Sequence, residues 1–213
     1  MYSFANSLSY ISMFSVLIPI IFYLIAKEKK GVIKVLFILL LMSLASDLGN
    51  EIFVRTGRRG YQILNTFFII QFFLLSNIYY RLLNNKLIVY YAIFLFSIFF
   101  IINTSFIQSI YEYQSWCRLV GGVFIIIYTA NYHFQLFKTS DEQLHSSPLW
   151  LNGAVSFYFS VNLYLVTMAN SFFKNMPTDV AMNMWMFHNF NIIIKNIFFT
   201  VAICCAGAKQ KKD

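Results

Sequence analysis

Seven apolar stretches follow one another along almost the whole chain, and each is close to the length of a helix that crosses a membrane. Such a helix needs about 20 mostly apolar residues. The polar segments between the stretches are too short to hold a second domain. We therefore predict an all-α fold in which residues 1–213 form one domain, a single bundle of seven transmembrane helices. The expected ranges are 8–26, 32–54, 61–81, 87–105, 115–137, 149–172 and 181–206.

The composition agrees with a membrane location. Hydrophobic residues make up 59% of the chain and charged residues 11%, whereas about 25% of the residues of a soluble domain are charged. The formal net charge of +8 would suggest nucleic acid as a partner for a soluble protein. Here the basic residues lie between apolar stretches, where they indicate topology. We expect membrane lipid as a partner and no nucleic acid.

The distribution of lysine and arginine predicts the orientation, because basic residues in short loops mark the cytoplasmic side. One side carries ten of them and the other four, which puts the N-terminus outside and the C-terminus in the cytoplasm of a multi-pass protein of the bacterial inner membrane. The first stretch has no basic leader or small-residue cleavage site, so we expect it to be a retained helix. The ten are Lys27, Lys29, Lys30, Lys34, Arg81, Lys86, Lys138, Lys209, Lys211 and Lys212; the four are Arg55, Arg58, Arg59 and Lys174.

The last apolar stretch contains a histidine, asparagines and a lysine. His188, Asn191 and Lys195 are spaced i, i+3 and i+7, which favours one face of a helix. A lysine near the middle of a membrane-crossing helix is costly and normally faces the protein interior, where it needs a partner.

Other stretches carry matching polar groups. Asp47 and Glu51 are one helical turn apart, with Asn50 beside them. Two acids, Asp47 and Glu51, stand against Arg118, Lys195 and one histidine, and most of these groups fall in the outer half of the bundle. We predict that they converge on one polar ligand-binding cavity; the alternative is a buried network that only holds helices together. The candidate ligand-binding residues are Asp47, Asn50, Glu51, Asn65, Gln71, Arg118, Asn162, His188, Asn191 and Lys195.

Three further features carry structural expectations. Tyr79, Tyr80, Tyr90 and Tyr91 fit an aromatic belt at the membrane surface. Pro19 predicts a kink in the first helix. The pair Gly121-Gly122 favours close approach of two helices.

The sequence favours neither a metal nor a cofactor. A metal hydrolase needs clustered ligands, but His133 and His145 are expected at or beyond the cytoplasmic face and His188 in the outer half. The cysteines form no metal-ligand pattern or disulfide framework.

Two alternative functions use the same residues. Asp47 and Glu51 could activate water against a lipid, as in the small membrane lysoplasmalogenases, which are similar in size and hydrophobicity. A lysine in the seventh helix resembles the arrangement of the microbial rhodopsins, in which Lys195 would bind retinal, with Asp47 or Glu51 as counter-ion. A small transporter or ion-conducting protein using Lys195 is a further alternative.

Several stretches resemble a group of seven-span membrane proteins of Bacteroidota. They are Phe68-Ile-Ile-Gln71-Phe-Phe-Leu-Leu, Ser146-Ser-Pro148-Leu-Trp150-Leu-Asn152, Tyr158-Phe-Ser160-Val-Asn162-Leu, and Trp185 through Asn196. The position of Gln71 is often glutamate in that group. The resemblance implies a stand-alone membrane protein that acts as the sensory partner of a separate kinase.

We expect a non-enzymatic receptor or sensor. A small ligand would enter the outer half, alter the pairing of Asp47 and Glu51 with Arg118 and Lys195, and shift the balance between two states. The short cytoplasmic segments require a separate cytoplasmic signalling partner.

Overall fold

The computed structural model describes residues 2–26, 29, 31–58, 60–138, 146–175 and 178–208. Within these ranges all regular structure is helical, as predicted, and no strand occurs. The side chain of Lys174 is not among the described parts of the chain. Also outside the described residues are His145 and the orientation residues Lys27, Lys30, Arg59, Lys209, Lys211 and Lys212.

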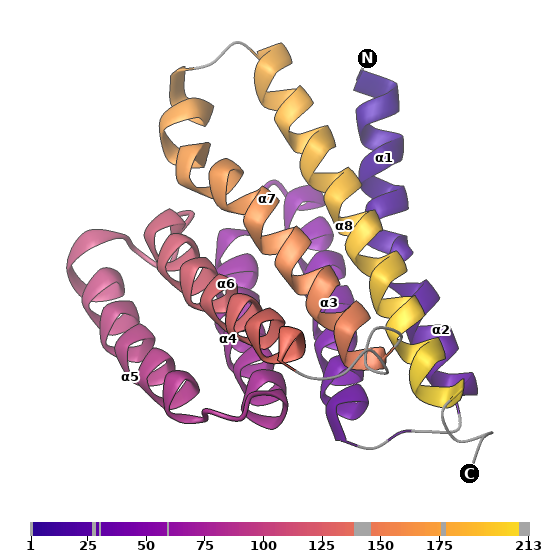
Figure 1. Cartoon of the computed structure of the whole chain (residues 1–213). Helices are drawn as coiled ribbons and strands as arrows, with labels where there is room; N and C mark the ends of the chain where they lie inside the picture. Colours follow the sequence, from indigo (N-terminus) through magenta and orange to yellow (C-terminus); the bar gives the residue numbers. More distant parts are fainter. Residues whose placement is uncertain are drawn as a thin grey trace.

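The helix α2 continues in the direction of α1, and the later long helices alternate in direction, with the two chain ends at opposite ends of the bundle (Figure 1). A short π-helical turn, η1, follows α5. The helices are α1 (Tyr2–Ser15), α2 (Leu17–Ile25), α3 (Gly31–Arg55), α4 (Tyr61–Leu82), α5 (Leu87–Ile102), η1 (Asn103–Ile107), α6 (Ser115–Phe137), α7 (Ser147–Asn175) and α8 (Thr178–Ala208).

Six segments of the described residues are long and apolar enough to cross a membrane, which is the architecture of a multi-pass membrane protein. They correspond to the first five predicted stretches and the last. The remaining predicted stretch, 149–172, is helical as α7, but the side chains of 166–175 lie outside the described part. The six segments are Phe4–Ile25, Gly31–Arg55, Tyr61–Leu82, Leu87–Ile107, Ser115–Phe137 and Val180–Ala206.

The helices α1 and α2 form one predicted stretch that is interrupted at Val16, three residues before Pro19. Proline has no N–H to donate to the carbonyl four residues earlier, which here belongs to Ser15. The interruption therefore lies where Pro19 predicts a kink. Asn196 of α8 donates from Nδ2 to Ser15 Oγ over 2.7 Å and ties α8 to this point.

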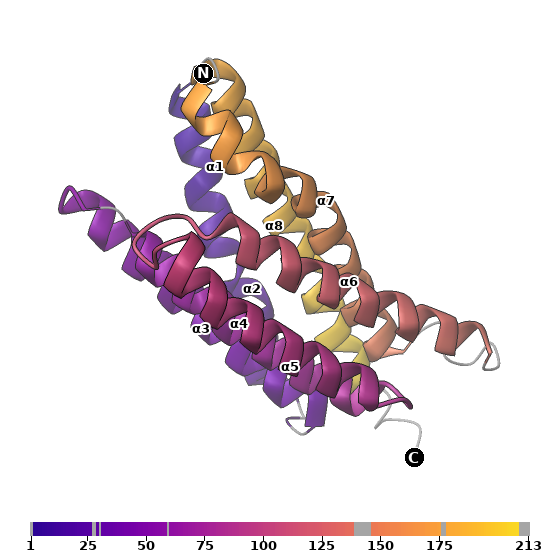
Figure 2. The same ribbon diagram turned by 90° about the vertical axis from the view of Figure 1, so that its left-hand side faces the viewer.

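The helices form a ring in which each packs on the next. Both α1 and α2 lie along α8, α8 along α7, α7 along α6, α6 beside α4, and α4 along α3, which returns to α2. α5 packs outside the ring against α4 and α6. Figure 2 shows α1, α7 and α8 inclined to the layer formed by α3, α4, α5 and α6.

The end of the ring nearer the C-terminus is filled by a packed core. Leu36, Phe72, Ile125 and Leu151, from four different helices, are completely or almost completely buried there. Close approach of α4 and α6 depends on Gly121, because a Cβ atom at this position would lie 2.9 Å from Phe68 Cζ. Cys204 and Cys205 are free, as is the buried Cys117.

This core contains a polar network, which we call the buried tyrosine network: Ser76, Tyr79, Tyr128 and Asn152, each 0% exposed. The Tyr79 hydroxyl donates to Asn152 Oδ1 over 2.7 Å, and Asn152 Nδ2 donates to the Thr129 carbonyl over 3.3 Å. The Tyr128 and Ser76 hydroxyls lie 3.3 Å apart. The assignment of Tyr79 to an aromatic belt is therefore wrong. Its neighbour Tyr80 does lie near the exposed Tyr90, whose hydroxyl donates to that of Tyr80 over 3.1 Å.

Candidate functional site

A cavity of about 190 Å³ lies in the half of the bundle nearer the N-terminus. A water molecule takes up about 30 Å³ of the liquid, so the cavity has room for a small organic molecule. Its walls come from α1, α3, α4, α6, α7 and α8 and from Tyr113 in the loop before α6. The six helices contribute residues from their halves on the same side of the bundle, so the cavity belongs to one end only.

Eight of the ten candidate residues line this cavity, so their predicted convergence on one cavity is observed, although apolar side chains form much of its wall. Their binding of a ligand stays a prediction. The eight are Asp47, Asn50, Glu51, Gln71, Arg118, Asn162, His188 and Lys195. Asn65 and Asn191 are not part of the lining.

The α3 wall is polar because of its helical spacing. The lining residues of α3 lie at spacings of i, i+4, i+7 and i+8, so all fall on one side of the helix: Ser43, Asp47, Asn50 and Glu51. Asn50 also packs its side chain against Gly60, where α4 begins. The stripe places two carboxylates along one wall of the cavity.

Asp47 and Lys195 face the same cavity from α3 and α8, and their opposite charges attract each other. No hydrogen bond or direct ion pair joins them, and among the described residues the only ion pair is that of Glu51 with Arg55. Lys195 is 9% exposed, and its Nζ lies over the Tyr158 ring, 4.5 Å from the centroid. An aromatic face attracts a cation, so Tyr158 supplies part of the stabilisation that Lys195 needs.

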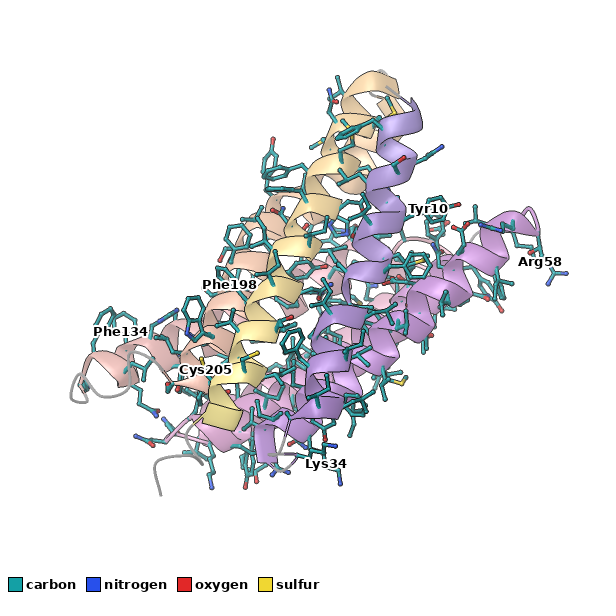
Figure 3. The ribbon with its side chains drawn as sticks, turned by 90° about the vertical axis from the view of Figure 1, so that its right-hand side faces the viewer. Tyr10, Lys34, Arg58, Phe134, Phe198 and Cys205 are labelled. Carbon is teal, nitrogen blue, oxygen red and sulfur yellow. The ribbon has the colours of Figure 1, made fainter. Side chains whose placement is uncertain are left out.

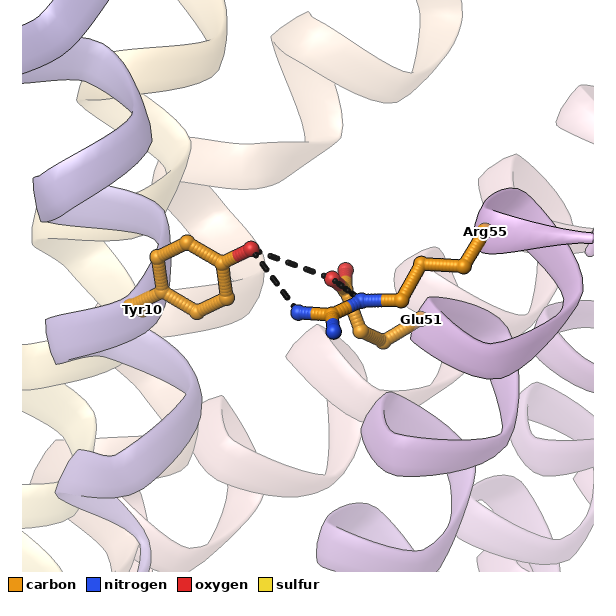
Figure 4. Close-up of polar contacts among 3 residues, drawn as sticks. All are labelled: Tyr10, Glu51 and Arg55. Carbon is orange, nitrogen blue, oxygen red and sulfur yellow. Dashed lines mark hydrogen bonds and ion pairs between the residues drawn. The ribbon is translucent and has the colours of Figure 1, made fainter.

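Glu51 has different partners from those expected. Arg55 donates from Nε to Glu51 Oε1 over 2.8 Å, and the Tyr10 hydroxyl donates to the same oxygen over 3.1 Å. Arg55 Nη2 also donates to the Tyr10 hydroxyl over 3.3 Å. Figure 4 shows this three-residue arrangement, which we call the rim contact, joining α1 to α3. The predicted pairing of Glu51 with Arg118 or Lys195 is wrong, because Arg55 lies one helical turn away on the same helix.

Arg118 extends from α6 between two aromatic rings. Its guanidinium carbon lies 5.1 Å from the centroid of the Phe68 ring and 4.7 Å from that of Tyr113. Arg118 Nη2 donates to the Leu64 carbonyl over 2.8 Å, whereas its buried Nε has no hydrogen-bond partner among the described residues. No described carboxylate forms an ion pair with it.

Asn65 supports the cavity from outside its lining. Its Nδ2 donates to the carbonyls of Ile110 and Glu112 over 2.9 and 2.6 Å, and its Oδ1 accepts from Gln114 N over 3.4 Å. These bonds hold the loop that carries Tyr113. Asn65 Oδ1 also accepts from Arg118 Nη2 over 3.5 Å, so Asn65 supports a lining residue as well as the loop. Asn65 is not itself part of the lining, and the prediction that it lines the cavity is wrong.

His188 is oriented by Asn162. The Asn162 amide donates from Nδ2 to the Tyr158 carbonyl over 2.8 Å, so its Oδ1 is the acceptor that faces His188 Nδ1 at 2.6 Å. His188 Nδ1 therefore carries a proton and donates it to this bond. The ring also lies against Trp185, with centroids 5.3 Å apart.

The face of α8 toward the cavity is turned slightly from the one expected. Trp185, His188, Asn189, Ile192 and Lys195 line the cavity, and this face is centred near Ile192. Asn191 falls just beyond its edge, so the prediction for Asn191 is wrong. Asn189 is 4% exposed, lines the cavity and has no described partner for its Nδ2.

Several lining residues were not predicted from the sequence. Ser9, Ser12 and Met13 come from α1, which carries no charge, and Tyr158 and Phe159 come from an aromatic-rich helix. Asn189 stands next to His188, so the polar run of the last helix was the available signal. The sequence did not predict the contact of Tyr158 with Lys195, because it depends on how α7 and α8 pack against each other.

Among the described residues no group of three or more histidine, cysteine, aspartate or glutamate side chains is placed to hold a metal ion. The arrangement instead offers charged groups, amides and aromatic rings around a small space, which suits non-covalent binding of a small polar or charged molecule.

Comparisons with protein families, with curated proteins and with solved structures found no match. The resemblance to the seven-span proteins of Bacteroidota therefore stays a prediction.

Proposed function

We propose that the protein is a non-enzymatic receptor of the bacterial inner membrane that binds a small ligand in this cavity. The observation that carries the proposal is the combination of Asp47, Arg118 and Lys195 around one cavity without a direct ion pair between them. Charged groups within a membrane domain are costly and are usually functional. Groups that served only to hold helices together would be expected to be paired.

The proposed topology has seven transmembrane helices, with the N-terminus outside. Its support is the placement of basic residues at the two ends of the bundle. Lys34 lies at the end that also carries Cys205 of α8, and Arg58, just beyond the C-terminal end of α3, lies far from it (Figure 3). In this orientation the cavity belongs to the outer half, where a ligand from outside the cytoplasm would reach it.

The rim contact provides the element that a ligand would shift. Glu51 lines the cavity and also bonds Tyr10 of α1 and Arg55 of α3. A ligand that changes the position of Glu51 would change the distance between α1 and α3. Since α1 and α2 both pack on α8, this movement would reach the opposite end of the bundle as a population shift between two packings.

A separate cytoplasmic signalling protein would read that shift. Its proposed docking side carries the basic residues Lys34, Arg81, Lys86 and Lys138 near helix ends. Acidic groups on the partner would complement this charge.

The test measures the distance between α1 and α3 in full-length protein in nanodiscs of neutral phosphatidylcholine. Spin labels at Phe4→Cys and Ile52→Cys, positions that are 66% and 61% exposed, report the distance in a background with Cys204→Ser and Cys205→Ser. The probes are four matched molecules: phenylacetate, phenylacetamide, phenethylamine and phenylalanine. A receptor predicts that at least one changes the distance distribution. If all four leave it unchanged, the proposal is contradicted.

Three further assays of the purified full-length protein separate the alternatives. Lysolipid hydrolysis that is abolished by Asp47→Asn or Glu51→Gln would favour a lipid hydrolase. Proteoliposome flux lost in Lys195→Met would favour a transporter or ion-conducting protein, and a visible absorption band would favour retinal bound to Lys195.

A further inference from the structure

The charges around the cavity do not balance. Glu51 is bound to Arg55, whose side chain lies outside the lining. Apart from histidine and tyrosine, the other described ionisable side chains of the lining are one acid, Asp47, and two bases, Arg118 and Lys195. Asp47 and Lys195 attract each other, so the guanidinium of Arg118 is left without a matching carboxylate. An uncompensated charge in a site of low dielectric is unfavourable, and a single negative charge in the cavity would offset it.

The two fully buried hydrogen-bond groups of the lining residues that lack a described partner are both donors. Buried Arg118 Nε and Asn189 Nδ2 both lack a described partner, and Lys195 Nζ makes no hydrogen bond to a described residue. Asn189 is 4% exposed, so water from outside the protein does not satisfy it freely. Leaving buried donors unpaired is costly. The charged ends of Arg118 and Lys195 are also donors, so a ligand with acceptor oxygens suits this lining better than a cationic amine does.

The lining also contains several aromatic side chains. Phe67, Phe68, Tyr158, Phe159 and Trp185 contribute rings from three helices. Binding sites commonly combine apolar and aromatic walls with a few polar groups that fix the ligand's orientation. The body of the ligand is therefore expected to be apolar, with its charged group near the donors.

We infer that the cavity binds a small organic anion of single negative charge, an oxyanion such as a carboxylate carried on an apolar or aromatic body. This inference rests on the proposed receptor function and names its ligand class. The oxyanion accepts hydrogen bonds from Arg118, and the rings enclose the apolar part. A zwitterion would leave the positive excess of the site in place, and a cation would increase it.

The experiment compares the four phenyl probes by calorimetric titration of full-length protein in phosphatidylcholine nanodiscs. Phenylacetate is expected to bind about tenfold or more tightly than phenylacetamide, a difference of about 1.4 kcal/mol or more. In Arg118→Gln this preference is expected to disappear. The control is Arg81→Gln, which removes an exposed arginine whose Nε donates to Asn77 Oδ1 at the other end of the bundle. This control should keep the preference.

The outcomes separate the two proposals. Tighter binding of phenylacetamide, phenethylamine or phenylalanine would overturn the anion assignment and leave the receptor proposal standing. Binding by none of the four would count against both. Retention of the phenylacetate preference in Arg118→Gln would also overturn the assignment. If Arg118→Gln fails to fold, a competition experiment with the unaltered protein tests the same anion selectivity. Benzoate is expected to displace phenylacetate, and benzamide is not.

The oxyanion could come from a soluble carboxylate or from the headgroup of an anionic lipid. Nanodiscs that contain phosphatidylglycerol distinguish these sources. Competition between this lipid and phenylacetate would support the anion site with a lipid as its source. Unchanged phenylacetate affinity would support a soluble carboxylate.

Discussion

The two halves of the bundle both contain buried polar side chains, but they differ in how these side chains are partnered. In the buried tyrosine network, Tyr79 and Asn152 are completely buried and hydrogen-bonded. Around the cavity, Asp47 and Lys195 share a space without a direct bond, and the buried atoms Arg118 Nε and Asn189 Nδ2 lack described partners. A satisfied network can stabilise and specify helix packing, whereas a partly satisfied one is costly. The difference indicates that the first region is structural and that the second retains its polar groups for another reason.

The largest expected effect on stability comes from the buried tyrosine network. Asn152→Leu removes the acceptor of the Tyr79 hydroxyl and the donor to Thr129. Leaving a buried hydroxyl unsatisfied should lower the free energy of unfolding by about 1–3 kcal/mol. Reversible unfolding of the full-length protein in mixed micelles measures this change, and phenylacetate binding should be unaltered.

The matched control is a double-mutant cycle with Tyr79→Phe. In the Asn152→Leu background this second change should cost less than in the original protein, because its partner is already absent. Equal costs in both backgrounds would show that the bond between Tyr79 and Asn152 does not stabilise the bundle.

The cavity should show the opposite pattern. The double variant Asp47→Asn with Lys195→Met removes two charges that form no direct ion pair. Replacing buried charges by neutral side chains of similar volume is often neutral or stabilising, so unfolding should change by less than about 1 kcal/mol or become harder. A loss of stability as large as that of Asn152→Leu would make the cavity residues structural and remove the contrast between the two halves.

The features that the sequence predicted well are those set within one helix. Hydropathy over about 20 residues locates the apolar helices, and helical periodicity places Asp47, Asn50 and Glu51 on one side of α3. The i, i+4 spacing of Glu51 and Arg55 could also have been read from the sequence, but the predicted helix ended at residue 54 and placed Arg55 in a loop. Its helix runs to Arg55, which brings the guanidinium back to Glu51.

Features that depend on contacts between helices were harder to predict. Tyr79 is buried because Asn152, 73 residues later in the chain, accepts its hydrogen bond. Asn65 is used by the loop carbonyls of Ile110 and Glu112, and the position of that loop is not encoded near Asn65. Asn189 lines the cavity in place of the predicted Asn191, because α8 is rotated slightly about its axis from the expected orientation. The packing of α8 on α7 and α1 sets this rotation.

The smallest expected effect concerns the rim contact. Tyr10→Phe removes the one hydroxyl that joins α1 to Glu51 and Arg55 and leaves the bond between those two side chains intact. Exposed hydrogen bonds contribute little to stability, so unfolding should hardly change. Because α1 loses this tie to α3, the α1–α3 distance distribution should broaden toward longer distances before any probe is added. Tyr90→Phe is the matched control, since it removes an exposed hydroxyl bonded to Tyr80 away from the cavity. A Tyr10→Phe distribution that matches both the original protein and Tyr90→Phe would show that the rim contact does not set the resting distance, and the proposed switch would then have to lie elsewhere in the cavity wall.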